Sequence, residues 1–110
     1  MNSASPFISV IIPVFNRSWQ LRRALESLRD QTFRDFEVIV CDDGSSEDIA
    51  SVVKDFEGNL NIQVIHMSNW GGPARPRNKG LELSRGQWIS FLDSDDWWDL
   101  NRLSIMSDYI

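Results

Sequence analysis

The sequence has few of the features that mark secreted, membrane-spanning or nucleic-acid-binding proteins. Its single cysteine, Cys41, cannot form an internal disulfide, so a reducing compartment is the simplest setting. No apolar run reaches the roughly 20 residues that span a bilayer, and residues 1–6 lack the basic and apolar regions of a signal peptide. The formal net charge of −5 argues against a nucleic-acid partner. We therefore expect a cytoplasmic domain without a transmembrane segment.

What the sequence does contain is a regular alternation of two kinds of segment. Its 110 residues suit one small domain, and a hydrophobic content of 42% is enough for a modest core. Short apolar runs alternate with segments whose apolar residues recur at helical spacing. This alternation predicts an α/β domain, in which a parallel sheet is covered by helices on both faces. The predicted strands are residues 7–12, 36–41, 62–66 and 88–92.

The first and the fourth of these predicted strands are expected to be buried, and Pro13 is expected to end the first strand. We expect Ser18 to be the N-cap of the first helix, and Ser45 with Asp48 to form a capping box for the second. Pro76 fits the first turn of the third helix. The fourth helix is expected to begin at about Asp99. The apolar stripes of the first, second and fourth helices are Leu21, Ala24, Leu25 and Leu28, then Ile49, Val52, Val53 and Phe56, then Leu103, Met106 and Ile110.

Ligands of open parallel sheets bind beyond the carboxyl ends of the strands, which directs attention to the loops that follow them. Residues 93–96 are Asp-Ser-Asp-Asp, directly after an apolar strand. Three carboxylates this close repel one another, and their desolvation is costly unless a cation is present. Carboxylates suit Mg²⁺ or Mn²⁺, and such an ion would also hold a diphosphate. The alternative is a helix N-cap followed by an acidic first turn.

Polar residues also follow the first two predicted strands. Asp42 comes at the end of the second strand, where its carboxylate could accept hydrogen bonds from ribose hydroxyls or from a base; the alternative is a turn capped by the aspartate. Asn16 and Arg17 come after the first strand, at the rim of the same edge. Here the alternative is a plain turn into a helix. His66 ends the third strand, and a loop histidine satisfied by its neighbours is the simpler interpretation.

Basic residues gather where the third helix is expected to begin. Arg75, Arg77 and Lys79 lie close to its first turn, where the helix dipole disfavours cations. Their placement is explained if an anion docks there, because free N–H groups and arginine both bind phosphate. Such local charge would offset the negative charge of the whole chain. The alternative is a solvated basic face.

Together these segments resemble the family-2 glycosyltransferases of the GT-A fold. The resemblance implies that residues 1–110 form a single partial domain, the nucleotide-sugar-binding half, with the acceptor-binding half absent. It also implies a spatial strand order of 3-2-1-4. The matching motifs follow the order of the family and cover nearly the whole chain: residues 9–17 (SVIIPVFNR), 25–32 (LESLRDQT), 36–45 (FEVIVCDDGS), 77–80 (RNKG) and 91–96 (FLDSDD).

The resemblance also implies roles for individual residues. Asp42 would bind the base, Arg77 would lie near the donor phosphates, and Asp95 with Asp93 would ligate Mn²⁺ or Mg²⁺. The metal would stabilise the departing nucleoside diphosphate, while an acceptor hydroxyl attacks directly and inverts the anomeric centre. The family's general base lies downstream of this chain. The residues expected to contact the nucleotide sugar are Pro13, Val14, Asn16, Arg17, Asp42, Asp43, Arg77, Asp93 and Ser94.

The function implied is the transfer of a hexose from a nucleotide sugar, with a UDP-sugar as the expected donor. The acceptor would be a saccharide or a lipid-linked saccharide, in cell-surface polysaccharide synthesis at the inner face of the membrane. Trp97 and Trp98 follow the acidic loop, where they could stack on a sugar, although packing is the simpler interpretation. With Trp70, these rings could form an exposed apolar surface that favours a homodimer.

Three other functions remain open from the sequence. A phosphatase with an Asp-x-Asp motif places that motif on its first strand, whereas here it follows the fourth. A dinucleotide-binding enzyme would use an acid such as Asp42, but no Gly-x-Gly-x-x-Gly follows the first strand. The third alternative is a donor-binding or interaction module without transfer activity. It would bind a nucleoside diphosphate without turning over the donor.

Overall fold

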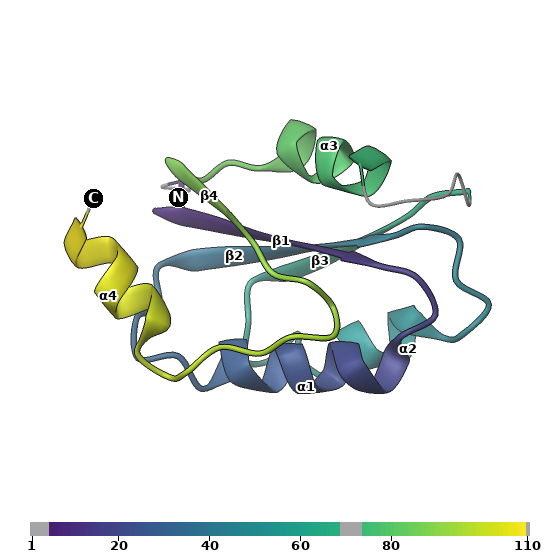
Figure 1. Cartoon of the computed structure of the whole chain (residues 1–110), viewed down its shortest axis with the longest axis horizontal. Helices are drawn as coiled ribbons and strands as arrows, with labels where there is room; N and C mark the ends of the chain where they lie inside the picture. The colour runs from purple at the N-terminus through teal and green to yellow at the C-terminus, as the bar shows by residue number, and fades with distance from the viewer. Residues whose placement is uncertain (1–4, 69–73, 110) are drawn as a thin grey trace.

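The computed structural model describes residues 5–68 and 74–109, and its centre is a four-stranded sheet (Figure 1). All neighbouring strands are parallel, and their spatial order is β3-β2-β1-β4. Both the α/β class and the strand order of the sequence-based prediction are therefore confirmed. The strands are β1 (Ile8–Val14), β2 (Phe36–Asp42), β3 (Ile62–His66) and β4 (Trp88–Phe91).

Helices cover both faces of the sheet, as expected. The α3 helix lies on one face, while α1 and α2 lie side by side on the other (Figure 1). Within residues 5–68 and 74–109, no helix has the length and apolar character needed to cross a membrane. The helices are α1 (Ser18–Arg29), α2 (Ile49–Lys54), α3 (Ala74–Leu83) and α4 (Arg102–Tyr109).

The core consists of two apolar layers, one on each side of the sheet. Alternate residues of a strand point to opposite faces, so Val10 and Ile12 meet the α1 side while Ile11 meets the α3 side. The α3 side is thinner, and a glycine permits its close packing. A Cβ on Gly80 would lie 2.4 Å from Ile11 Cγ2, so a larger residue would push α3 away from the sheet.

The first strand does not end at Pro13, as the sequence predicted, but continues to Val14. Pro13 pairs in register with Cys41 of β2. Successive residues of a parallel strand direct their polar groups to opposite neighbours, and the β4 ladder ends where Leu92 N–H donates to the carbonyl of Ile11. Pro13 therefore faces the β4 side of β1, beyond the last bond between these two strands. Because no strand in the described part of the chain pairs with Pro13 on that side, its missing N–H costs no ladder hydrogen bond.

The predicted N-caps of α1 and α2 are both wrong, because different residues from those predicted accept the free N–H groups at the starts of these helices. Ser18 is the first residue of α1 rather than its N-cap, and its N–H donates to Glu47 Oε1 at 2.9 Å. Hydrogen bonding by Ser18 lowers the pKa of the Glu47 carboxyl. No Ser45–Asp48 capping box forms, because Asp48 is itself the N-cap of α2 and accepts the N–H of Ser51 at 3.1 Å.

The fourth strand and fourth helix also differ from expectation. β4 lies at the edge of the sheet, as the predicted strand order requires, but it is not buried as its sequence suggested: Trp88 and Phe91 are 49% and 41% exposed. The apolar run of this segment is typical of a buried strand, which is why the sequence misled. The α4 helix begins at Arg102 rather than near Asp99. Ile110, expected to face inward, lies outside the described residues.

A buried carboxylate ties the entry to β4 to the centre of the sheet. Glu37 Oε2 accepts hydrogen bonds from Ser9 Oγ at 2.6 Å and from the N–H of Arg85 at 2.7 Å. The N–H of Gly86 donates to Ser9 Oγ at 2.7 Å. These bonds satisfy a charge that would otherwise be costly to bury, and they fix where β4 starts.

Gly86 leaves no room for a side chain, because a Cβ would lie 2.5 Å from the backbone nitrogen of Ser9. We predict that Gly86→Ala lowers the free energy of unfolding in urea by about 1–3 kcal/mol, through displaced backbone and a strained Ser9 bond. Gly58→Ala is the matched control, because no heavy atom lies within 4 Å of a Cβ there. Equal losses in the two variants would contradict this account.

Burial raises the pKa of the Cys41 thiol from 9.0 to about 11. We predict that iodoacetamide labels Cys41 at least about tenfold more slowly in the folded chain than in the chain unfolded in urea, near pH 8. The folded chain holds the thiol proton more tightly than the unfolded chain, so stability should fall as pH rises from about 9 towards 11. Iodoacetamide labelling followed by mass spectrometry measures the first effect. Equal labelling rates would show that the thiol is accessible in the fold.

Candidate functional site

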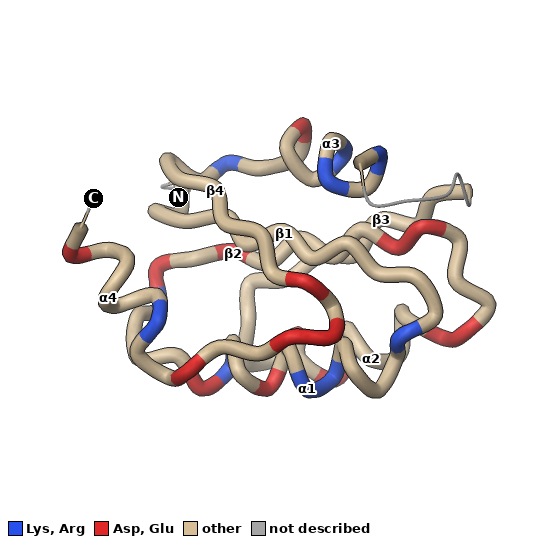
Figure 2. The backbone as a smooth tube through the Cα atoms, in the orientation of Figure 1, with Lys and Arg blue, Asp and Glu red and all other residues tan. Residues whose placement is uncertain are grey.

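The carboxyl ends of β1, β2 and β4 lie at one edge of the sheet, and the loops that follow them meet there. These are residues 15–17, 43–48 and 92–101. In Figure 2 the acidic residues of the loop after β4 appear as red segments, with basic residues of α1 and α3 on either side. The structure therefore brings together the loops that follow the first, second and fourth predicted strands. Residues 69–73, which make up most of the loop after the third strand, lie outside the described residues.

Asn16 joins the first two of these loops. Its backbone adopts a left-handed conformation, with φ of 51°, which asparagine tolerates better than most residues. Its side-chain oxygen accepts the N–H groups of Ser46 at 2.8 Å and Glu47 at 3.1 Å, while its own N–H donates to Ser45 Oγ at 2.9 Å. We call this set of hydrogen bonds the Asn16 clamp. It makes Asn16 a structural member of the rim, not an exposed turn residue.

Asp42 is buried, and both of its carboxylate oxygens are already engaged. Oδ1 accepts the N–H of Ser45 at 3.0 Å, and Oδ2 lies 2.9 Å from His66 Nδ1. The Asp42 carboxylate therefore holds the loop after β2 against the end of β3. The aspartate caps the turn, as the simpler interpretation of the sequence has it, while a contact between Asp42 and a ribose or base stays a prediction.

The acidic loop is compensated by arginines from two helices. Arg77 of α3 donates to Asp93 Oδ1 at 3.2 Å, and Arg17 at the start of α1 lies 3.6 Å from Asp95 Oδ2. The two carboxylate side chains are 60% and 56% exposed. Neither carboxylate is desolvated in this structure. Water and the arginine pairs balance the repulsion, and both carboxylates remain accessible to a ligand.

The basic start of α3 faces this loop, as the sequence suggested. Arg77 belongs to the first turn of α3, and its Nε is buried without a hydrogen-bond partner in the part of the chain that the structure describes. A buried donor of this kind is costly unless a ligand or water satisfies it. Arg75 Nη1 donates to the carbonyl of Ser68 at 3.3 Å, which ties the start of α3 to the residues after β3.

The donor chemistry of the acidic loop fits a divalent cation. Asp93 and Asp95 offer hard carboxylate oxygens that are open to solvent. Across residues 5–68 and 74–109, no cluster of three or more histidine, cysteine or acidic side chains is arranged to hold a metal. Two carboxylates suit Mg²⁺ or Mn²⁺ when phosphate oxygens and water supply the other ligands.

The remaining predicted site residues lie at the same edge but differ in exposure. Val14 is buried in the core below α1, and its carbonyl accepts the N–H of Asp43 at 2.9 Å. Asp43 and Ser94 are also buried, while Pro13 is partly exposed. These four residues therefore build the floor of the site more than its rim.

Sequence reasoning missed three residues that shape the site. Ser45 Oγ accepts the N–H of Asn16, and Glu47 accepts the N–H of Ser18 at the start of α1. Arg23 Nη2 donates to the carbonyl of Asp95 at 3.2 Å. The serine and glutamate carry a local signal, since such residues often cap helices, but Ser45 contacts the loop before α1 and Glu47 contacts α1 itself, which precedes them in the chain. The Arg23 contact spans 72 positions and has no local signature.

Known proteins share both the sequence and the architecture of this chain. The model of glycosyl transferase family 2 matches residues 9–110. An uncharacterized glycosyltransferase of Rickettsia bellii is 44% identical over 104 residues, which are 94% of this chain and 15% of that protein. The GalNAc(5)-diNAcBac-PP-undecaprenol beta-1,3-glucosyltransferase of Campylobacter jejuni is 41% identical over 93 residues, which are 83% of this chain and 30% of that protein.

A solved structure has the same fold. Staphylococcus aureus TarS 1–349 in complex with UDP-GlcNAc matches with a TM-score of 0.91 and 34% sequence identity, covering 94% of this chain and 31% of that chain. This chain thus spans less than a third of the length of these three relatives. Because the family match covers nearly every residue of the sheet and its strand-end loops, the chain belongs to glycosyl transferase family 2 and has a GT-A-type fold.

Proposed function

We propose that this chain binds the nucleotide-sugar donor of a glycosyltransferase. The protein would transfer a hexose, with inversion, from a UDP-sugar to a saccharide or lipid-linked acceptor. The observation that carries the proposal is the pairing of two exposed carboxylates, Asp93 and Asp95, with arginines at the starts of α3 and α1. Opposite charges placed at one sheet edge suit a ligand that brings both phosphate oxygens and a cation.

Arg77 is the proposed phosphate ligand. Its Nε is a buried donor without a partner among the described residues, and its Nη2 already points to the acidic loop. A diphosphate at this position would accept a hydrogen bond from Arg77 Nε. Its negative charge would also be stabilised by the positive charge at the first turn of α3. Arg17, paired with Asp95 on the opposite side, would contribute further positive charge.

Asp93 and Asp95 would hold Mg²⁺ or Mn²⁺. When bound, such an ion supplies Lewis-acid stabilisation of the charge that develops on the leaving diphosphate. The protein residues supply the geometry, because Arg17, Arg23 and Arg77 hold the loop in position from two helices. Ser94, buried between the two aspartates, would keep the loop close to the donor sugar.

The nucleoside would lie against the loop after β2. Asp42 positions this wall through Ser45 and His66, and the Asn16 clamp joins it to the end of β1. Asp42 thus acts on the base chiefly as a positioning residue, with Pro13 and Asp43 beneath. The general base that activates the acceptor hydroxyl would come from outside these 110 residues.

The donor and acceptor classes are supported by relatives. TarS was solved with UDP-GlcNAc, and the Campylobacter jejuni relative is named for a lipid-linked saccharide acceptor. A donor-binding module without transfer activity is the second candidate, because the chain spans less than a third of these relatives. Binding of UDP without hydrolysis or transfer of a UDP-sugar would favour it.

We predict that Mn²⁺ strengthens UDP binding by the unmodified chain by about tenfold or more, and that Asp95→Asn abolishes this gain. The amide removes the charged oxygen ligand while keeping the size of the side chain. Isothermal titration with UDP, with and without Mn²⁺, measures the difference. Asp96→Asn removes the same charge from the same loop and should keep the Mn²⁺ effect. A metal response in Asp95→Asn equal to that of the unmodified chain would refute the assigned ligand.

The Asn16 clamp generates a second prediction. Asn16→Gly keeps the left-handed backbone but removes the side-chain acceptor, so it should lower the free energy of unfolding by about 1–3 kcal/mol and weaken UDP binding. Asn16→Asp retains an acceptor oxygen and should lose less of both. Urea denaturation and UDP titration measure the two effects. Full UDP affinity in Asn16→Gly would show that the clamp does not shape the site.

A further inference from the structure

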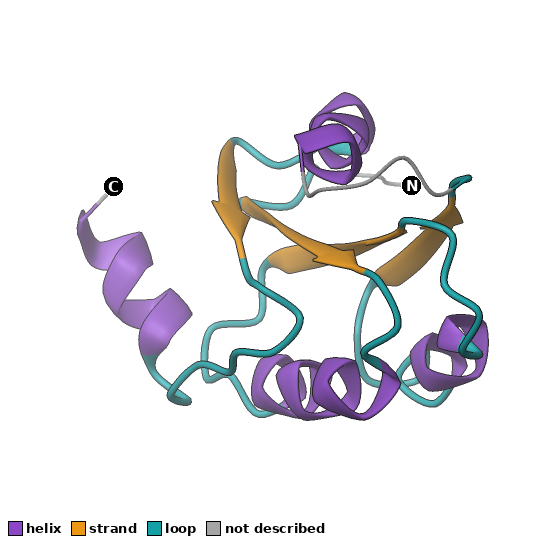
Figure 3. Ribbon diagram, turned by 45° about the vertical axis from the view of Figure 1, so that its right-hand side comes forward, coloured by secondary structure: helices purple, strands orange, loops and turns teal. Residues whose placement is uncertain are grey.

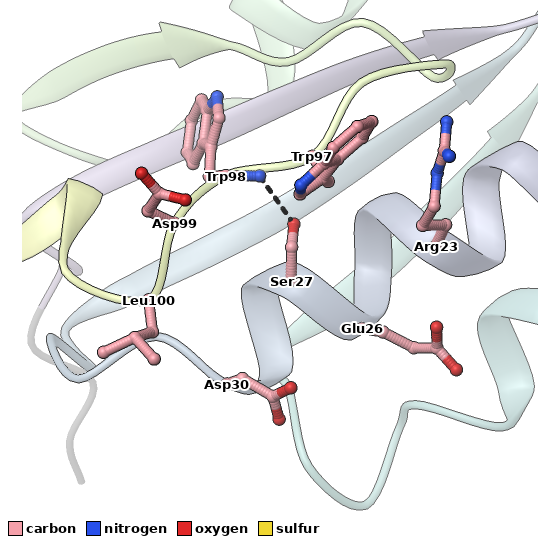
Figure 4. Close-up of a pocket in the computed structure, with 8 residues that line it drawn as sticks. All are labelled: Arg23, Glu26, Ser27, Asp30, Trp97, Trp98, Asp99 and Leu100. Carbon is pink, nitrogen blue, oxygen red and sulfur yellow. Dashed lines mark hydrogen bonds between the residues drawn. The ribbon is translucent and has the colours of Figure 1, made fainter.

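A hollow of about 380 Å³ lies beside the acidic loop, on the surface of α1. After the acidic residues, the segment between β4 and α4 runs along α1 before α4 begins (Figure 3). Residues 97–100 and the second half of α1 form the walls of the hollow (Figure 4). Of the residues that line the hollow, Arg23 also contacts the acidic loop of the proposed donor site, through the carbonyl of Asp95.

The structure separates the two adjacent tryptophans. Trp98 is only 7% exposed and packs in the core, and its backbone N–H donates to Ser27 Oγ at 3.1 Å. Trp97 is 53% exposed and forms one wall of the hollow. Packing, the simpler interpretation of the sequence, therefore applies to Trp98 alone. An indole ring that stays half exposed beside a hollow has a flat apolar face available to a ligand.

Arg23 fixes the orientation of this wall. Its guanidinium carbon lies 4.3 Å from the centre of the Trp97 ring and 5.5 Å from that of the exposed Trp19. Its Nη2 also donates to the carbonyl of Asp95. The stack of cation and ring holds Trp97 in place, so a ligand would meet a surface that is already ordered.

The polar groups around the hollow are mainly carboxylates. Glu26 on α1, Asp30 at the C-cap of α1 and Asp99 in the loop line it, and Arg23 is the cation among the described lining residues. The Asp30 carboxyl is held by Arg29 at 3.0 Å, and this hydrogen bond lowers the pKa of Asp30. Negative walls repel nucleotides, phosphates and acidic lipids, while carboxylates accept hydrogen bonds from hydroxyl groups.

We propose that this hollow, outside the donor site, binds a neutral saccharide. The apolar C–H face of a pyranose ring would stack on Trp97, and its hydroxyl groups would donate to the carboxylates and accept from Arg23. The Arg23 contact with Asp95 places this subsite next to the acidic loop. That proximity suits a unit of the acceptor or of the growing product, an assignment that rests on the proposed function; saccharide binding itself does not.

The test is a titration of the ¹⁵N-labelled chain with chitotriose, followed by the indole and backbone N–H resonances in two-dimensional NMR. Chitotriose should shift the Trp97 indole signal and the amide signals of Ser27 and Leu100. Trp97→Ala should weaken chitotriose binding about tenfold or more, since it removes the apolar ring on which the sugar stacks. Trp88→Ala, at an equally exposed tryptophan on β4, should leave the affinity unchanged.

Two further titrations define what the hollow accepts. The deacetylated trisaccharide carries amines on the same ring skeleton, so binding of this form alone would replace the neutral saccharide with a cationic ligand and overturn the proposal. No shift with chitotriose or cellotriose, or equal losses in Trp97→Ala and Trp88→Ala, would also overturn it. UDP with diamagnetic Mg²⁺ should shift the amide signals of residues 42–47, whereas chitotriose should shift those of Ser27 and Leu100, so failure of the donor site and failure of the saccharide subsite are read from separate signals.

Discussion

The parallel arrangement of β1 between β2 and β4 is the constraint on which the site depends. In a parallel sheet every carboxyl end lies at the same edge, so three loops that are distant in the chain become neighbours. The buried Glu37, which holds the entry to β4 against β1, sets where that edge falls. Without this register, the loop after β4 would not meet the starts of α1 and α3.

Charge explains why those loops can stay together before any ligand binds. Asp93 and Asp95 are each matched by an arginine from a different helix, and Arg23 adds a contact to the loop backbone. Exposed ion pairs of this kind contribute little to stability, about 0–1 kcal/mol each. They are therefore easily exchanged, which would suit the proposed binding and release of phosphates and a cation.

Most of the fold, and part of the site, could be predicted from the sequence. Apolar runs and helical stripes are local signals, so the strand–helix alternation was found, with Pro76 in the first turn of α3. The family motifs pointed to Asp42, Arg77 and the acidic loop. The failures involve contacts that no local pattern encodes: Glu47 capping α1, and Arg23 reaching Asp95. Trp88–Phe91 was misjudged because an apolar run does not show how many neighbouring strands it has.

Pro13 has a consequence for how the edge of the sheet opens. β1 continues past the last bond to β4, and at that point it carries a residue that cannot donate one. Beyond that bond β1 and β4 are no longer paired, and Pro13 has no N–H with which to extend the ladder. The acidic loop follows β4 and the Asn16 clamp follows β1, so a missing hydrogen-bond donor in the backbone separates the two loops of the proposed donor site.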